Sequence, residues 1–277
     1  MGMGTITSNM PQRNVDRKRP GSSTSKSNPW FVCPHPNPGA ETRLFFFPYA
    51  GSGPSVFGKW LLELPNDLEG YAAHYPGRGS RYQEPPIKSL ATLVERLYQA
   101  IQPLLDKPFA FFGHSLGGLV AFELILRLRK NNLPQPAILF VSASEAPHLY
   151  DPHPLLHKLP DAEFLQALKR LNGTPTELLH HADLMTLLLP MLRADFEAIE
   201  NYRYVPNEPP LHIPIIAFGG LDDRRVSREH LEGWAKHTNV RFGSRYFSGD
   251  HFFLNTSREL ILESIISEIP RSPHAKT

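Results

Sequence analysis

A run of five residues near the middle of the chain, Gly113-His114-Ser115-Leu116-Gly117, has the pattern Gly-x-Ser-x-Gly. In that pattern a sharp turn between a strand and a helix lifts a serine hydroxyl above a sheet, where it can attack a carbonyl carbon. Glycines are needed there because neighbouring backbones approach too closely for a Cβ. An apolar stretch, 109–112, precedes the run and an amphipathic stretch follows it. We therefore predict that Ser115 is the nucleophile of a serine hydrolase; the alternative is a purely structural turn.

The predicted nucleophile requires a histidine, because a serine hydroxyl reacts slowly at neutral pH without a base. The histidine in turn requires an acid that orients its ring, and in this arrangement the chain order is serine, acid, histidine. Of the 13 histidines, His251 follows a strand candidate and a glycine in the last strand-to-helix loop. We predict His251 as the base, because His114, His180, His181 and His237 lie in helical or turn contexts that solvation or packing explains.

Two adjacent aspartates, Asp222 and Asp223, follow the strand candidate at 213–218. The carboxyl ends of strands are where α/β sheets place their sites. Adjacent side chains point in different directions, so only one of the two can hold the imidazole; Asp223 is favoured and Asp222 stays open. Asp250 precedes His251 directly, and we interpret it as a turn residue because such a neighbour seldom reaches the correct ring nitrogen.

A glycine-containing loop at 47–53 follows the first strand candidate. Serine hydrolases of this kind need two N–H donors for the oxyanion, one beside the nucleophile and one from a loop after an early strand. We predict the N–H groups of Leu116 and Ala50 as these donors, and Tyr49 and His114 as substrate-binding neighbours. A plain flexible loop is the alternative.

The elements that must position these residues alternate along the chain from residue 42 onward, as parallel strands and crossover helices do. Runs rich in β-branched or aromatic residues predict strands at 43–47, 71–74, 109–112, 138–142, 213–218 and 241–247. Apolar residues at three-and-four spacing predict helices at 89–105, 119–129 and 259–269. The sequence therefore predicts an α/β-hydrolase fold, with a mostly parallel sheet covered by helices on both faces.

One segment, 149–204, interrupts the alternation because it contains helical patterns and no convincing strand. The patterns predict helices at 162–171, 178–189 and 191–202. The apolar residues of this segment exceed what one helix needs to pack on a sheet. We expect either an inserted helical lid that also lines an acyl-binding channel or an ordinary helical subdomain.

The ends of the chain differ in composition from this domain. Residues 1–40 are rich in Ser, Pro, Asn and basic residues without a regular period, which predicts a disordered leader. The basic cluster Arg17-Lys18-Arg19 is interpreted as a solvated charge run. We expect one catalytic domain over 41–270, followed by a short tail over 271–277.

Composition limits the possible partners and the compartment. The 277 residues are 41% hydrophobic and 20% charged, as in ordinary globular proteins. Because 29 basic residues nearly balance 27 acidic ones, the net charge gives no reason to expect nucleic acid or an anionic membrane as a partner. A single cysteine, Cys33, cannot form an internal disulfide, and no apolar run approaches the roughly 18 residues of a spanning helix. The N-terminus lacks the apolar core of a secretory signal, and we expect a cytoplasmic protein.

Taken together, the motifs resemble those of the type II thioesterases that accompany nonribosomal peptide and polyketide synthases, enzymes of antibiotic biosynthesis. The resemblance spans about residues 42 to 269, with the motifs in the family's order. The matching runs are Phe-Phe-Pro-Tyr-Ala-Gly at 46–51, Tyr-Pro-Gly-Arg at 75–78, Glu-Pro-Pro at 84–86, Gly-His-Ser-Leu-Gly-Gly at 113–118, Gly-Gly-Leu-Asp-Asp-Arg-Arg-Val-Ser at 219–227 and Gly-Asp-His-Phe-Phe-Leu at 249–254.

The resemblance implies roles for individual residues and a reaction. It implies Ser115 as nucleophile, Asp223 as acid, His251 as base, and the N–H groups of Ala50 and Leu116 as the oxyanion hole. The implied reaction is hydrolysis of an acyl or aminoacyl thioester on the phosphopantetheine arm of a carrier protein, without a metal or bound cofactor.

The resemblance also implies partners, namely acyl or peptidyl carrier proteins. We expect a monomer, with neither nucleic acid nor a membrane as a partner. Carrier proteins are usually acidic, and Arg78, Arg81, Arg224 and Arg225 are candidates for meeting them. Editing of stalled or misprimed chains is the role that the resemblance favours. Product release, a general carboxylesterase or acyl-CoA hydrolase, and a noncatalytic carrier-binding protein stay open as alternatives.

Overall fold

The computed structural model describes residues 1–2, 28–151, 155–171 and 182–270, and its centre is a seven-stranded sheet. The strand order is β1-β3-β2-β4-β5-β6-β7. All neighbouring strands are parallel except β1, which is antiparallel to β3. The strands are β1 (Phe31–Val32), β2 (Thr42–Phe47), β3 (Leu68–Ala73), β4 (Phe109–His114), β5 (Leu139–Ser142), β6 (Ile215–Gly220) and β7 (Phe242–Phe247). The predicted α/β-hydrolase architecture is confirmed, and all six predicted strands are present.

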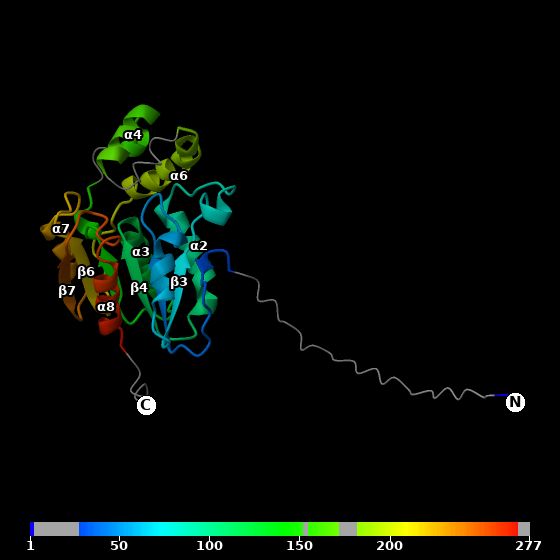
Figure 1. The fold of residues 1–277 in the computed structure, drawn as a ribbon. Coiled ribbons are helices and arrows are strands. Elements are labelled where there is room, and N and C mark those ends of the chain that lie inside the picture. The colour runs from blue at the N-terminus through cyan, green and yellow to red at the C-terminus, as the bar shows by residue number, and fades with distance from the viewer. Residues whose placement is uncertain (3–27, 152–154, 172–181, 271–277) are drawn as a thin grey trace.

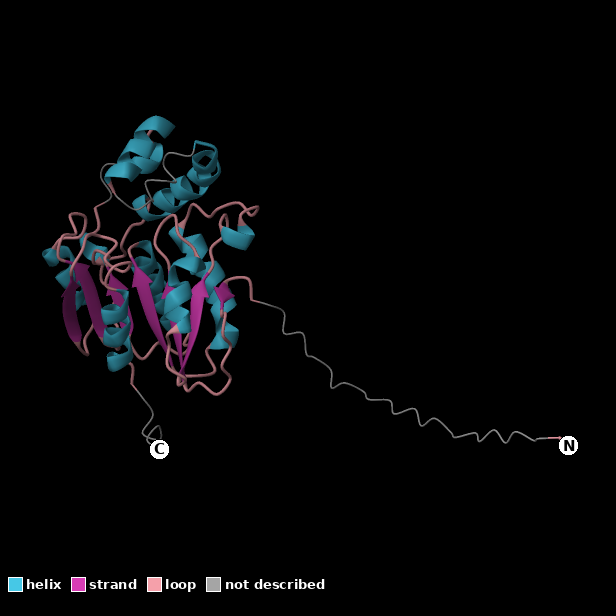
Figure 2. Ribbon diagram, in the orientation of Figure 1, coloured by secondary structure: helices cyan, strands magenta, loops and turns pink. Residues whose placement is uncertain are grey.

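Helices cover both faces of the sheet (Figures 1 and 2). The main helices are α1 (Gly58–Leu62), α2 (Leu90–Ile101), α3 (Leu116–Lys130), α4 (Asp161–Arg170), α6 (Ala182–Glu200), α7 (Arg228–Glu232) and α8 (Arg258–Glu268). The predicted helices at 89–105, 119–129 and 259–269 correspond to α2, α3 and α8. Ser89 caps α2 by accepting a hydrogen bond from the N–H of Thr92 at 3.3 Å.

Two apolar cores lie on opposite faces of the sheet because successive strand residues point to opposite sides. In β2, Phe45 and Phe47 pack with α2 and α3, whereas Leu44 and Phe46 pack with α1 and α8. All four of these side chains are fully buried. The strands are therefore uniformly apolar, as expected for a parallel sheet covered on both faces.

Residues 28–40 belong to the fold, so the prediction of a disordered leader over 1–40 is wrong for them. The two residues of β1 pair with β3, and Phe31 is only 4% exposed. The side chain of Asn28 donates a hydrogen bond to the carbonyl of Ala100 at 2.7 Å. A two-residue strand is too short to show a period of two in the sequence. The basic cluster at 17–19 and the predicted tail at 271–277 lie outside the described residues.

Helices α4 and α6 lie beyond the carboxyl ends of the strands (Figure 1). They have a small apolar core of their own, made by Phe164, Leu168, Met185, Met191, Leu192 and Phe196. Separate helices at 178–189 and 191–202 were expected, but α6 continues through Pro190. A proline inside a helix costs about 3 kcal/mol, and the apolar contacts of Met191 and Leu192 offset part of that cost. Residues 178–181 lie outside the described residues.

Within the described parts of the chain, none of the helices combines the length and apolarity that crossing a membrane requires.

Candidate active site

Ser115 lies at the turn between β4 and α3 and has φ 53° and ψ −117°. This strained conformation is held by close backbone packing. A Cβ on Gly113 would lie 2.1 Å from the carbonyl oxygen of Gly117, and one on Gly117 would lie 1.9 Å from that of Phe47. The N–H of Ser115 donates to the carbonyl of Ser142 at 2.8 Å. The glycines of the motif are thus required by contacts on both sides of the turn.

Asp223, and not Asp222, contacts the ring of His251. The distance from His251 Nδ1 to Asp223 Oδ2 is 2.9 Å. The other carboxylate oxygen of Asp223 accepts hydrogen bonds from the N–H groups of Arg225 at 2.8 Å and Val226 at 3.2 Å, so both oxygens are held. Asp222 is exposed.

Asp250 behaves as the predicted turn residue, because its carboxylate accepts a hydrogen bond from the N–H of Phe252 at 2.8 Å. The predicted base itself, His251, is 4% exposed and follows β7. Two histidines that sequence reasoning set aside, His180 and His181, lie outside the described residues.

Burial and pairing set the protonation states of this pair. Burial lowers the pKa of His251, and the hydrogen bond to Asp223 only partly opposes that shift. Burial would raise the pKa of Asp223, but its hydrogen bond and charge interaction with His251 bring the pKa below the ordinary value. At neutral pH the imidazole is therefore neutral and the carboxylate ionised, which is the state that a general base requires.

The second ring nitrogen of His251, Nε2, is buried and has no hydrogen-bond partner among the described residues. His251 and Ser115 line one cavity of about 420 Å³. Buried polar atoms are nearly always satisfied in folded proteins, so an unpartnered nitrogen facing a reactive cavity indicates a functional group. Ser115 and His251 therefore border the same space, as proton transfer from the serine hydroxyl to Nε2 would require.

The loop between β2 and the short helix η1 (Pro54–Phe57) brings Ala50 to the same place. Ala50, Tyr49 and Ser115 line a narrow recess, and Leu116 begins α3 directly after the nucleophile. Helix N-termini carry free N–H groups and a partial positive charge, which favours an oxyanion. The structure thus brings together both predicted N–H donors and the nucleophile.

Tyr49 and His114, which were predicted to bind substrate, have different places in the structure. Tyr49 lines the recess beside Ser115 and its ring contacts that of Phe252, with 5.2 Å between centroids. His114 is fully buried, with Nδ1 2.9 Å from Ser142 Oγ and Nε2 3.0 Å from the carbonyl oxygen of His251. Because both ring nitrogens are engaged beneath the site, the expectation that His114 contacts substrate is wrong.

The cavity at Ser115 is lined mainly by apolar side chains from the lid side and from α3. These are Leu116, Leu119, Leu156, Leu171, Phe196 and Ile199. An acyl-binding lid was one of two expectations for segment 149–204, the other being an ordinary helical subdomain, and neither identified these residues. The spacing of Phe196 and Ile199 on one face of α6 was the available signal. Five charged residues also line it: Glu145, Asp151, Arg170, Glu200 and Arg225. The cavity can therefore hold an apolar chain that carries a polar group.

Two of the four arginines considered for carrier docking are buried. Arg78 is 6% exposed and Arg81 is 8% exposed. Arg81 pairs with Glu84 at 2.6 Å and lies over the ring of Trp30, with 4.2 Å from Cζ to the centroid. The expectation that Arg78 and Arg81 meet a partner is wrong, because each is taken up by internal contacts. Arg224 and Arg225 are exposed.

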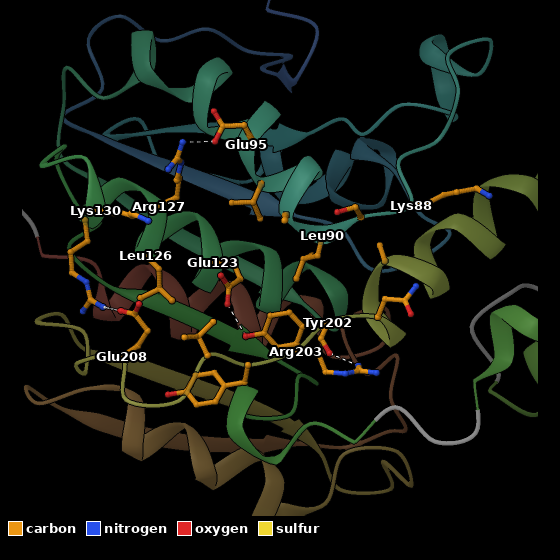
Figure 3. Close-up of a pocket in the computed structure, with 18 of the residues that line it drawn as sticks. Lys88, Leu90, Glu95, Glu123, Leu126, Arg127, Lys130, Tyr202, Arg203 and Glu208 are labelled. Carbon is orange, nitrogen blue, oxygen red and sulfur yellow. Dashed lines mark hydrogen bonds and ion pairs between the residues drawn. The ribbon is translucent and has the colours of Figure 1, made fainter.

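A larger groove of about 1010 Å³ lies elsewhere, between α2, α3 and the segment that follows α6 (Figure 3). Neither Ser115 nor His251 lines it. Several of its polar side chains are paired with each other: Arg127 with Glu95 at 2.7 Å, Arg129 with Glu208 at 2.8 Å, and Tyr202 with Glu123 at 2.7 Å. Because neither the predicted nucleophile nor the predicted base lines it, this groove is separate from the proposed reaction site.

Comparison with known proteins gives concordant results. The sequence matches the thioesterase domain family over residues 42–272. It is 42% identical over 243 residues to linear gramicidin dehydrogenase LgrE of Brevibacillus parabrevis, covering 87% of this chain and 92% of that protein. Gramicidin S biosynthesis protein GrsT of Aneurinibacillus migulanus is 41% identical over 245 residues, covering 88% and 95%. The solved type II thioesterase BorB from the borrelidin biosynthetic cluster has a TM-score of 0.80 at 33% identity, covering 87% and 98%.

Proposed function

The chain belongs to the thioesterase family, as a type II thioesterase with the α/β-hydrolase fold, and we propose that it hydrolyses acyl or aminoacyl thioesters on the phosphopantetheine arm of carrier proteins. The observation that carries the proposal is the Asp223–His251 pair: Nε2 of His251 has no partner in the described part of the chain, and His251 lines a cavity with Ser115. Ser115, Asp223 and His251 support a hydrolase and not the dehydrogenase activity in the name of LgrE.

The first half of the reaction transfers the acyl group to the enzyme. His251 Nε2 takes the proton of Ser115 as Oγ attacks the thioester carbonyl carbon, and the N–H groups of Ala50 and Leu116 bind the resulting oxyanion. The carbon–sulfur bond then breaks, and the imidazolium returns its proton to the departing pantetheine sulfur. Asp223 keeps the ring oriented and stabilises its positive charge.

The second half releases the acid. A water molecule loses a proton to His251 Nε2 and attacks the acyl-enzyme carbonyl carbon, and the same two N–H groups bind the second oxyanion. Collapse of this intermediate breaks the bond to Ser115 Oγ, which regains its proton from His251. The products are a carboxylic acid and the original serine.

The size of the cavity supports editing over release of a finished product. A volume of about 420 Å³ accommodates a short acyl or aminoacyl group, at the lower end of ordinary ligand pockets. A full-length peptide or polyketide exceeds that space. We therefore propose that the enzyme removes small, stalled or misprimed groups from carrier domains.

The proposed partner is an acidic carrier protein in the cytoplasm. Arg224 and Arg225 are exposed and Arg225 also lines the cavity, and this positive charge supports docking of an acidic partner. A cytoplasmic site is consistent with a single half-buried cysteine, Cys33, which has no internal disulfide partner.

The test compares three substrates with one acyl group: an acyl-carrier thioester, the acyl-CoA and an oxygen ester. We expect the highest kcat/KM with the carrier thioester. Ser115→Ala should abolish hydrolysis and labelling by a fluorophosphonate, whereas Ser80→Ala, at an exposed serine, should change neither. Equal rates on all three substrates would favour a general esterase, and unchanged hydrolysis by Ser115→Ala would refute the mechanism.

A further inference from the structure

A buried ion pair connects α6 to the loop that carries Ala50. Asp195, on α6, is 3% exposed and accepts two hydrogen bonds from Arg78, at 2.8 and 2.7 Å. The Oδ2 atom of Asp195 also accepts a hydrogen bond from the N–H of Gly51 at 2.8 Å. Arg78 in turn donates to the carbonyl of Ser52 at 2.9 Å. The carboxylate of Asp195 thus holds the loop at Gly51, and the guanidinium of Arg78 holds it at the next residue, Ser52.

Apolar contacts between α6 and the same loop reinforce this connection. Ala50 packs against the apolar core of α4 and α6. Gly51 has φ +81°, and a Cβ at that position would lie 2.3 Å from Leu192 Cδ2, so the loop backbone lies directly against α6. A larger side chain at this position would be strained by the positive φ and would require Leu192 to move.

We propose that Asp195 and Arg78 are positioning residues that fix the orientation of the Ala50 N–H, so that α6 and the oxyanion hole form one unit. The hydrogen bond from Gly51 to Asp195 fixes the peptide plane directly after Ala50, which limits rotation about that residue. This inference rests on the proposed role of Ala50 as an oxyanion donor. Removing one oxyanion donor costs a factor of about 10² to 10³ in kcat, so a misplaced donor has a measurable effect.

The ion pair itself argues for a role beyond stability. Burying two charges costs solvation energy, and well-packed apolar replacements of such pairs are often equally stable or more stable. What an apolar pair cannot supply is an acceptor for the N–H of Gly51. The buried carboxylate of Asp195 therefore holds the backbone of Gly51, which stability alone does not require.

The primary experiment measures Asp195→Asn with p-nitrophenyl butyrate, which needs the triad and the oxyanion hole but no carrier. The single oxygen of an asparagine cannot replace both carboxylate oxygens, so its NH2 group must face a donor of Arg78 or Gly51, and the negative charge opposite Arg78 is lost. We expect kcat to fall about 10- to 100-fold with KM changed less than about twofold. Affinity for a phenylboronic acid, which places a negatively charged tetrahedral centre on Ser115, should fall in parallel with kcat.

A second variant separates positioning from folding. R78M/D195L replaces the ion pair by apolar side chains and should restore the melting temperature without restoring kcat or boronate affinity. Glu197→Gln is the control on the same helix. It removes a surface ion pair with Lys88 at 3.4 Å and should leave the melting temperature, kcat and boronate affinity unchanged.

Two outcomes would overturn the inference: unchanged kcat and boronate affinity in folded Asp195→Asn, or recovery of full kcat in R78M/D195L. The second outcome decides the question even if Asp195→Asn does not fold. A wild-type enzyme that cleaves the ester but ignores acyl-carrier thioesters would refute the proposed function alone, since the comparison of variants would still measure the oxyanion hole.

Discussion

His114 Nε2 lies 3.0 Å from the carbonyl oxygen of His251, so the residue before the nucleophile supports the backbone of the base. A carbonyl accepts only, so Nε2 carries the proton and Nδ1 accepts from the hydroxyl of Ser142 at 2.9 Å. Burial lowers the pKa of His114 well below the ordinary value, which keeps this ring neutral. The contact links β4, β5 and the loop after β7 directly beneath the site.

Replacing His114 should therefore impair catalysis through the position of His251. His114→Ala leaves the carbonyl of His251 without its donor, and we expect kcat to fall about tenfold with KM little changed. His114→Gln, which retains an N–H donor, should recover part of the loss. Steady-state kinetics with one ester substrate measure both, with exposed His212 replaced by Ala as a control. An increase in KM at constant kcat would instead indicate substrate contact.

The pH dependence of the reaction should reflect the environment of His251. Burial lowers its pKa, the hydrogen bond to Asp223 opposes this, and the charge of Arg225 lowers it further. Because the neutral ring is the base, kcat/KM should rise with pH through a midpoint below about 6.5, the ordinary histidine value.

Arg225→Gln removes the positive charge that disfavours the imidazolium, so the pKa of His251 should rise and the acid limb should move to higher pH. Profiles of kcat/KM from about pH 4.5 to 8 measure this shift. An acid limb that moves to lower pH in the variant would contradict the assignment of His251 as the base.

The sequence was sufficient to predict the local parts of the fold and site. Ser115 and His251 each follow a strand and lie two residues from a glycine, so their context is readable within about ten residues. Strand limits were less accurate: β3 begins at Leu68, three residues before the expected start, because Glu69 and Gly70 do not follow an apolar pattern.

Contacts between distant residues could not be predicted in this way. Arg78 and Asp195 are 117 positions apart, and an arginine without a visible partner is most simply placed at the surface. The prediction that His114 binds substrate failed for the same reason, because its partners, Ser142 and the carbonyl of His251, lie on other elements. Local sequence patterns identify a reactive group but not the contacts that support it.

The turn at Ser115 should tolerate no side chain at Gly117. The Cβ of Gly117→Ala would lie 1.9 Å from the carbonyl oxygen of Phe47, within β2, so the central sheet must shift. We expect a loss of about 3 kcal/mol or more in the free energy of unfolding. Gly58→Ala is the matched control, because a Cβ there meets nothing within 4 Å in helical backbone, and the change should be neutral or slightly stabilising. Urea unfolding of both variants measures the difference, and equal stabilities would contradict the close packing of the turn.

The length of acyl chain accepted by the enzyme should depend on Ala167 of α4, which lines the cavity at Ser115. Ala167→Leu extends a larger side chain into a space of about 420 Å³. We expect kcat/KM for a hexanoyl ester to fall about tenfold while that for the acetyl ester changes less than about twofold, because a methylene in such a pocket contributes about 1 kcal/mol or more.

Gln166→Leu provides the control for Ala167→Leu, since Gln166 is the preceding residue on α4 and its side chain is exposed. This variant adds apolar bulk to the same helix outside the cavity and should leave the ratio of hexanoyl to acetyl kcat/KM unchanged. The two ratios, measured at one pH and enzyme concentration, decide whether α4 lines the acyl site. Equal loss on both esters in Ala167→Leu would indicate a displaced helix, and no loss on either would show that the acyl chain lies elsewhere.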